Sequence, residues 1–281
     1  LNTVFMKISL DTIPPVVNVG VRFTLGALCI LPLALRNWKP LKAKYLLLFM
    51  LASILGITLS SLSLNIGLRQ VPAFNAAVIW LTSPILLVLL SASLLREKIS
   101  TRTFIGIAIA IAGSMIVIGR PDGGNTQSSL TGNLFILLSV IFDCLSVLMI
   151  KPLLKRASPF QVTFLSFLPG SLPVLIYALF NHGNWSVSSV SKSSAIAFTL
   201  STTAIIISNV LFFYALRRRQ AHSIGIFSYI DPMLSVVGAW FILGERPAPA
   251  FALGAGLIVT GLCFTELKRA HHYLGHHRHH R

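Results

Sequence analysis

The chain has 281 residues, of which 54% are apolar and only 11% are charged, and its formal net charge is +16. This composition excludes an ordinary soluble domain and predicts an all-α integral membrane protein, because such long apolar runs need lipid to cover them. The positive charge does not indicate a nucleic-acid partner, since the cations stand in short segments between the apolar runs.

Runs of roughly 20 apolar residues, separated by charges and prolines, predict ten membrane spans. The expected spans are residues 1–12, 16–35, 45–68, 73–95, 103–119, 132–154, 160–180, 194–216, 221–243 and 249–267. The first run is short, so we expect this span to be truncated and to begin before Leu1.

Cations concentrate in every second connection, as in Arg36–Lys44 after the second span and Arg217–Arg219 after the eighth. An excess of Lys and Arg marks the cytoplasmic side of a membrane protein. We therefore expect a multi-pass protein of the cytoplasmic (inner) membrane with both termini in the cytoplasm.

One sequence pattern occurs twice: a proline, then a glutamate and a cation thirteen residues later, then two glycines seven residues apart. The two copies, 148 residues apart, are Pro84, Glu97, Lys98, Gly106 and Gly113, and then Pro232, Glu245, Arg246, Gly254 and Gly261. The beginnings of the copies match at an offset of 144, as in Lys7/Lys151, Pro15/Pro159, Phe23/Phe167 and Gly26/Gly170. These matches predict a duplicated five-helix unit.

A unit with an odd number of spans crosses the membrane in opposite directions in its two copies, so we expect two inverted five-helix repeats. The first repeat covers residues 1–119 and the second 132–268. Residues 120–131 form an outer linker, and residues 269–281 form a His- and Arg-rich cytoplasmic tail.

Pro84 and Pro232 fall near the middle of their spans, where a proline kinks a helix and removes the hydrogen bond of the carbonyl four residues earlier. The carbonyls affected are those of Trp80 and Ser228. Each is tolerated in a membrane if it faces protein, water or a ligand, so a packing kink and a ligand contact both stay open.

Asp143 and Asp231 are the acids expected at mid-depth, where a carboxylate costs about 2.5–3.5 kcal/mol to insert. We interpret them as coupling groups whose protonation biases which way a cavity faces, with a structural hydrogen bond to a nearby hydroxyl as the alternative. Arg22, in the second span, is a third coupling candidate. It could neutralise either acid, attract a substrate carboxylate or extend along lipid to the surface.

Polar side chains recur at helical spacing within several spans, as in Ser139, Asp143 and Ser146 or Ser228, Asp231 and Ser235. Because lipid rejects such faces, they predict a polar path through the middle of the protein. The residues we expect to touch a substrate are Asn65, Trp80, Ser228, Tyr229 and Asp231.

Glu97 and Glu245 lie at hairpin junctions, just before the start of a helix. We expect them to close their hairpins by binding helix-terminus amides, with a gate latch as the alternative. The paired glycines Gly106/Gly113 and Gly254/Gly261 are expected to allow close helix packing.

No catalytic set appears, since no buried His or Cys has an acid at a suitable spacing and no glycine-rich phosphate loop follows a strand. We expect neither enzyme activity, nor a cofactor, nor a metal site in the spans. The tail His271–Arg281 holds six of the eight histidines. It is suited either to a basic contact with anionic lipid or to metal binding.

The doubled pattern, with Pro15 and Arg22-Phe23 in the second span, resembles the EamA-like branch of the drug/metabolite transporter superfamily over nearly the whole chain except the tail. The resemblance implies a central cavity between two halves and export of amino acids or other small metabolites. We expect a secondary transporter that works by alternating access, coupled to protons or driven by the substrate gradient. Its partners are a small-molecule substrate and the lipid bilayer, and a homodimer is allowed. The alternatives are a membrane scaffold or sensor with the same fold, and a metal or drug efflux protein.

Overall fold

The computed structural model describes residues 2–36, 38–83, 85–87, 89–90, 101–119, 129–154, 156–181, 185–218, 230–245 and 252–261. Within these ranges the regular secondary structure is helical, and no strand occurs. The all-α expectation is therefore confirmed for the part of the chain that the structure describes.

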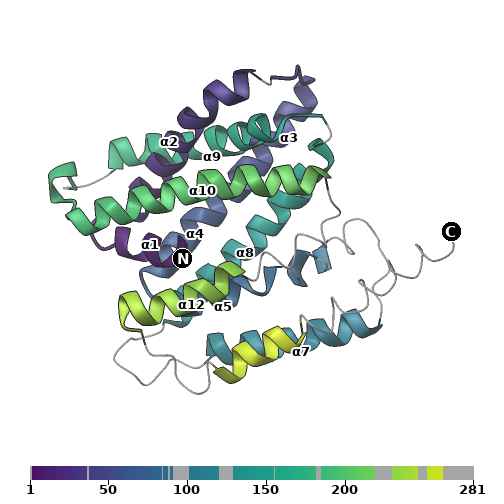
Figure 1. Ribbon diagram of the computed structural model, residues 1–281, viewed down its shortest axis with the longest axis vertical. Helices are drawn as coiled ribbons and strands as arrows, with labels where there is room; N and C mark the ends of the chain where they lie inside the picture. Colours follow the sequence, from purple (N-terminus) through teal and green to yellow (C-terminus); the bar gives the residue numbers. More distant parts are fainter. Residues whose placement is uncertain are drawn as a thin grey trace.

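The helices follow the expected order along the chain (Figure 1). The first half contains α1 (Asn2–Ser9), α2 (Pro15–Arg36), α3 (Ala43–Ser53), a π-helix (Ile54–Ser61), α4 (Leu62–Leu68), α5 (Ala73–Trp80) and α7 (Thr101–Gly119). The second half contains α8 (Leu130–Ile150), α9 (Pro159–Asn181), α10 (Lys192–Arg218), α12 (Ile230–Leu243) and a further helix at 252–261. Short 3-10 turns cover Lys151–Leu153 and Val187–Ser189.

Five helices of the described ranges are long and apolar enough to cross a membrane: Pro15–Arg36, Ala43–Leu68, Leu130–Leu153, Pro159–Asn181 and Lys192–Ala215. Large apolar side chains on the outer surface are exposed, for example Phe180 at 82% and Phe241 at 74%. Such a surface suits lipid rather than water. The chain is thus a multi-pass membrane protein, and the count of ten spans stays a prediction.

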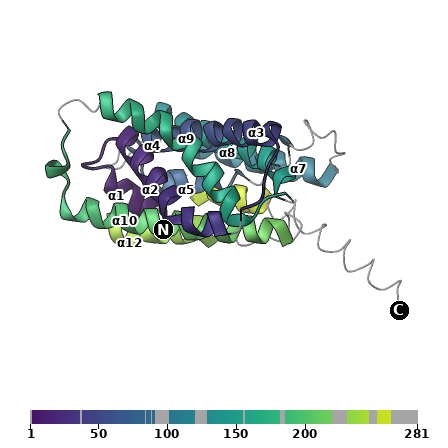
Figure 2. The ribbon, with the colours of Figure 1, turned by 90° about the horizontal axis from the view of Figure 1, so that it is seen from above.

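Helices α2 and α9 lie side by side, as do α1 and α10 (Figure 1, Figure 2). In the first pair, Phe23 and Phe167 stack edge to face with ring centroids 5.0 Å apart. A Cβ atom on Gly20 would meet Leu175, and one on Gly26 would meet Phe167, so residue numbers rise along one helix as they fall along the other. The two helices are therefore antiparallel.

The glycines of the doubled pattern also pair with one another. A Cβ atom on Gly113 would lie 2.6 Å from the carbonyl oxygen of Gly254, and one on Gly261 would meet the carbonyl oxygen of Gly106. Helix α7 and the yellow helix 252–261 therefore touch backbone to backbone and run antiparallel (Figure 1). Close packing at these four glycines was expected, and it is what a glycine-rich helix contact provides in a membrane.

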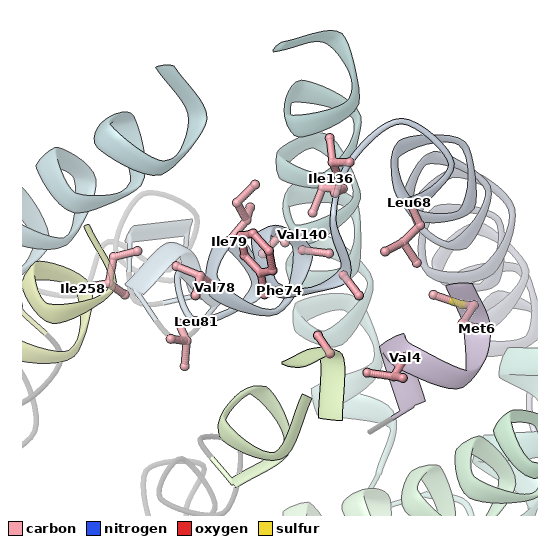
Figure 3. Packing of buried hydrophobic residues seen from close by; sticks show 14 of the residues in the cluster. Val4, Met6, Leu68, Phe74, Val78, Ile79, Leu81, Ile136, Val140 and Ile258 are labelled. Carbon is pink, nitrogen blue, oxygen red and sulfur yellow. The ribbon is translucent and has the colours of Figure 1, made fainter. Parts of the chain in front are cut away.

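The largest apolar cluster joins both halves of the chain (Figure 3). Helix α5 supplies its centre, and α1, α4 and α8 surround it. Its labelled members are Val4, Met6, Leu68, Phe74, Val78, Ile79, Leu81, Ile136, Val140 and Ile258. Helix α5 therefore packs against elements from both halves.

The glycine contact predicts a position-specific loss of stability. We expect Gly113→Leu to lower the unfolding free energy by about 1–3 kcal/mol, because the new side chain forces two backbones apart. Thermal denaturation in detergent measures the effect. Gly256→Leu is the matched control, since a Cβ atom at Gly256 would meet no atom within 4 Å. Equal melting temperatures for the two variants would contradict the close contact.

Candidate functional site

Arg22 is buried within the bundle, with 2% of its surface exposed. Its Nη1 donates to the Met6 sulfur at 2.9 Å, and its Nη2 donates to Asn2 Oδ1 at 2.8 Å and to the Ser201 carbonyl at 3.0 Å. The guanidinium of α2 therefore ties α1 to α10. Its Nε is buried and has no hydrogen-bond partner among the described residues.

No described acid lies within ion-pair distance of Arg22. The structure therefore does not bring Arg22 and Asp143 together, and the guanidinium does not extend along lipid to the surface. A buried cation without a carboxylate is costly, since charges inside proteins are normally paired. Attraction of a substrate carboxylate stays a prediction for this residue.

Asn65, on α4, is 1% exposed and lies near the Met6 sulfur that Arg22 also contacts. Its Nδ2 donates to the Ser61 carbonyl at 2.7 Å and approaches the Met6 sulfur at 3.6 Å. Its Oδ1 is buried and has no partner in the described part of the chain. Met6, on α1, thus contacts two expected site residues, Arg22 on α2 and Asn65 on α4.

Trp80 is the last residue of α5, and its buried indole Nε1 has no hydrogen-bond acceptor among described atoms. The helix tightens just beyond it, because the amides of Leu81 and Thr82 bind carbonyls three residues earlier, at 3.0 Å each. This break precedes Pro84, which itself lies outside the described residues. The helix is thus interrupted close to where the proline was expected to act.

Asp143, on α8, is half-buried and forms no hydrogen bond or ion pair with any described residue. The hydroxyls expected beside it donate elsewhere: Ser139 to the Ile136 carbonyl at 2.6 Å, and Ser146 to the Ala52 carbonyl at 2.7 Å. The alternative of a structural hydrogen bond to these hydroxyls is therefore not what the structure contains. An acid on a face of α8 that packs on the third span thus has no partner in the described part of the chain.

The π-helix Ile54–Ser61 is a feature that the sequence did not predict. It packs on α8 and α9, where a Cβ atom on Gly56 would lie 2.5 Å from the Ser146 hydroxyl. Irregular turns of this kind occur frequently at functional sites of helices. Nothing in the local sequence distinguishes this stretch from a regular apolar helix.

Glu245 joins the two halves at one end of the molecule. It is 5% exposed, and its carboxylate accepts hydrogen bonds from the amides of Ala73 at 3.0 Å and Phe74 at 3.3 Å. Lys7 Nζ forms an ion pair with it at 2.8 Å and also donates to the Val71 carbonyl at 2.6 Å. We expected Glu245 to bind amides of its own hairpin, whereas the amides belong to the start of α5.

The turn at Gly244 explains this direction. Gly244 has a φ angle of 65°, which is a left-handed conformation that favours glycine. Helix α12 ends just before this residue, at Leu243. The amide of Glu245 then donates to the Ala239 carbonyl at 3.2 Å. The chain therefore leaves α12 with the Glu245 carboxylate beside the positive end of the α5 dipole.

Several expected site residues lie outside the described residues. Ser228, Tyr229 and Glu97 are among them, and of Asp231 and Pro232 only the place on α12 is described. The described ranges contain no group of three His, Cys, Asp or Glu side chains suited to a metal ion, and they do not include the His271–Arg281 tail.

Sequence reasoning missed Asn2, Met6, Lys7 and Ser201 as partners of the polar residues. The match of Lys7 with Lys151 was the available signal for Lys7. A thioether and a backbone carbonyl carry no comparable signal, because any apolar span contains many of them.

The fold and this site define a multi-pass helical membrane protein with polar groups in its interior. The chain belongs to the EamA-like transporter family, whose sequence profile matches residues 1–119 and 130–267. The resemblance inferred from the doubled pattern is thereby confirmed.

Relatives of the chain include proteins named as transporters. It is 28% identical over 272 residues to the uncharacterized transporter YetK of Bacillus subtilis, covering 94% of this chain and 82% of the relative. It is 27% identical over 222 residues to a probable terminal-alkyne amino-acid exporter of Streptantibioticus cattleyicolor, covering 79% and 73%. A crystal structure of a chain 19% identical superposes over 94% of both chains with a TM-score of 0.63, which supports the fold.

The contacts of Arg22 predict a loss of stability when they are removed. We expect Arg22→Gln to lower the unfolding free energy by about 1.5–3 kcal/mol, because hydrogen bonds from the charged group to α1 and α10 are lost. Thermal unfolding in detergent tests this. Arg36→Gln is the matched control, since Arg36 is exposed at the end of the same helix. A wild-type melting temperature for Arg22→Gln would refute the structural role.

Proposed function

We propose that this protein is a secondary transporter that exports small metabolites, such as amino acids or related compounds, by alternating access. Membership of the EamA-like family and the name of one relative, a probable terminal-alkyne amino-acid exporter, support this proposal. The same proposal includes a location in the cytoplasmic membrane.

The observation that carries the proposal is a set of unmatched polar atoms in the interior. Arg22 Nε, Asn65 Oδ1 and Trp80 Nε1 are buried and have no partner among the described residues. Leaving such an atom unsatisfied costs about 1–3 kcal/mol. Buried groups of this kind normally form hydrogen bonds with protein or ordered water. These atoms are therefore suited to hydrogen bonds with water and with a transiently bound substrate.

The chemistry of these groups favours an amino-acid-like cargo. A guanidinium binds carboxylates well, because its N–H groups match the two oxygens. An indole N–H and an amide oxygen add one donor and one acceptor. We propose that Asn65 and Trp80 contact the substrate together with Ser228, Tyr229 and Asp231, and that Arg22 attracts its carboxylate.

Asp143 is proposed as a proton-coupling group, with Asp231 as a second. An unpaired acid within a membrane span is a functional candidate, because its charged form is costly there. Protonation removes this cost, so the protonation state of the acid biases which conformation is favoured.

We also propose that the two halves are inverted repeats. The antiparallel packing of α2 on α9 and of α7 on helix 252–261 supports this relation, as do the two segments matched by the family. With the cation-rich connections in the cytoplasm, Lys7 and Glu245 lie at the outer end of the bundle.

Flux in proteoliposomes tests the function. We expect efflux of a subset of radiolabelled amino acids, increased by an opposing proton gradient. Asp143→Asn should abolish the response to the proton gradient, because the residue can no longer ionise. Asp11→Asn is the matched control, since Asp11 is exposed in the turn after α1. Asp231→Asn tests the second acid in the same way.

Two outcomes would contradict the proposal. No flux of any compound in a wide metabolite panel, from a full-length and folded protein, would favour a scaffold or sensor. Unchanged gradient dependence in both Asp143→Asn and Asp231→Asn would remove proton coupling through these acids.

A further inference from the structure

The contact among Lys7, Glu245 and the first amides of α5 is the described ion pair that joins the two halves. Glu245 follows α12 in the second half, whereas Lys7 and Ala73 belong to the first. The contact combines an ion pair with an acid placed at a helix N-terminus, and both interactions strengthen when water is excluded. It therefore links the two halves at this end of the bundle.

The repeat provides an internal comparison for this contact. Lys151 stands at the position of Lys7, 144 residues later, and Pro15 and Pro159 begin the next helix in each copy. Lys7 is only 25% exposed and fully engaged, whereas Lys151 is exposed and its side chain forms no hydrogen bond or ion pair with a described residue. Equivalent lysines thus have different surroundings.

This difference contrasts with contacts that both copies share. Gly113 against Gly254 and Gly261 against Gly106 are equivalent pairs, and both are closely packed. A permanent structural contact would be expected to recur in the same way. A lysine that is paired at one end, while its equivalent at the other end is exposed and has no partner among the described residues, is instead what one state of a two-state transporter displays.

Separation of Lys7 from Glu245 is also chemically feasible. Lys7 already has a quarter of its side chain exposed, and Glu245 follows the last turn of α12 rather than lying in mid-helix. If water enters this end, the carboxylate, the ammonium and the α5 amides all regain hydrogen-bond partners. In the closed state, the cost of removing both charges from water offsets much of the attraction between them.

We propose that Lys7, Glu245 and the amides of Ala73 and Phe74 form a latch that closes the outer end of the transport path and separates when that end opens. This inference rests on the proposed alternating access. It assigns the two side chains a positioning role, since neither is placed in contact with the substrate. Glu97, the repeat equivalent of Glu245, lies outside the described residues.

Cysteine accessibility in sealed vesicles of known orientation tests the latch. Cys29, Cys144 and Cys263 are first replaced by Ala, and Ala77→Cys is added as a reporter. Ala77 is buried one helical turn from Ala73, on the same face of α5. A membrane-impermeant maleimide applied to the outer side then reports how often this end opens.

We expect Lys7→Met and Glu245→Gln each to raise the outer labelling rate about tenfold, because the closed state loses a charged contact. Lys7→Arg should keep the rate low. Lys151→Met is the matched control, since the same chemical change falls on an exposed lysine with no partner among the described residues, and it should not raise outer labelling. Melting temperatures of the purified variants identify any that unfold, and Lys7→Met keeps the helix cap intact if Glu245→Gln does not fold.

Unchanged labelling in a folded Lys7→Met variant would overturn the latch, and so would an equal rise in Lys151→Met. The labelling needs no substrate, so its result is separate from the flux measurement. Flux with unchanged labelling would refute the latch and leave the transporter. A latch response without flux of any compound would refute the transporter and leave a gated membrane protein.

Discussion

The lack of hydrogen-bond partners in lipid is the constraint on which this structure depends. Polar groups within the spans must be satisfied by other parts of the protein. Hydroxyls therefore join neighbouring helices through carbonyls: Thr58 donates to Gly170 at 2.6 Å, Ser146 donates to Ala52 at 2.7 Å, and Ser53 donates to Ser166. Glycines bring the helices close enough for such contacts.

The same constraint gives meaning to the polar groups that stay unmatched. Arg22, Asn65 and Asp143 lie on three different helices, and each has an unsatisfied atom or charge among the described residues. An atom that binds a substrate has to be left free by the protein, as Arg22 Nε and Asn65 Oδ1 are among the described residues. The unmatched groups are thus the candidates for the proposed substrate binding and coupling, whereas the satisfied hydroxyls hold helices together.

Symmetry and asymmetry are also divided among the contacts. The pairs α2 with α9, and α7 with helix 252–261, bring together residues that match in the doubled sequence pattern. Lys7 and Lys151, in contrast, differ in exposure and in partners. Packed interfaces resist continuous deformation, whereas a few charged contacts at one end can form and separate. The contacts between matched residues are thus suited to a rigid frame, and the proposed latch is suited to motion.

The sequence by itself determined the helical class, the positions of the described spans and the close packing of the paired glycines, and it contains the doubled pattern that predicts a duplication. These features follow from local composition and spacing, which lipid constrains directly. Only the tertiary structure decided that Glu245 binds the start of α5, that Arg22 contacts Met6 rather than Asp143, and that residues 54–61 form a π-helix. Each of these depends on which distant helices meet, and a span's own residues do not specify its neighbours.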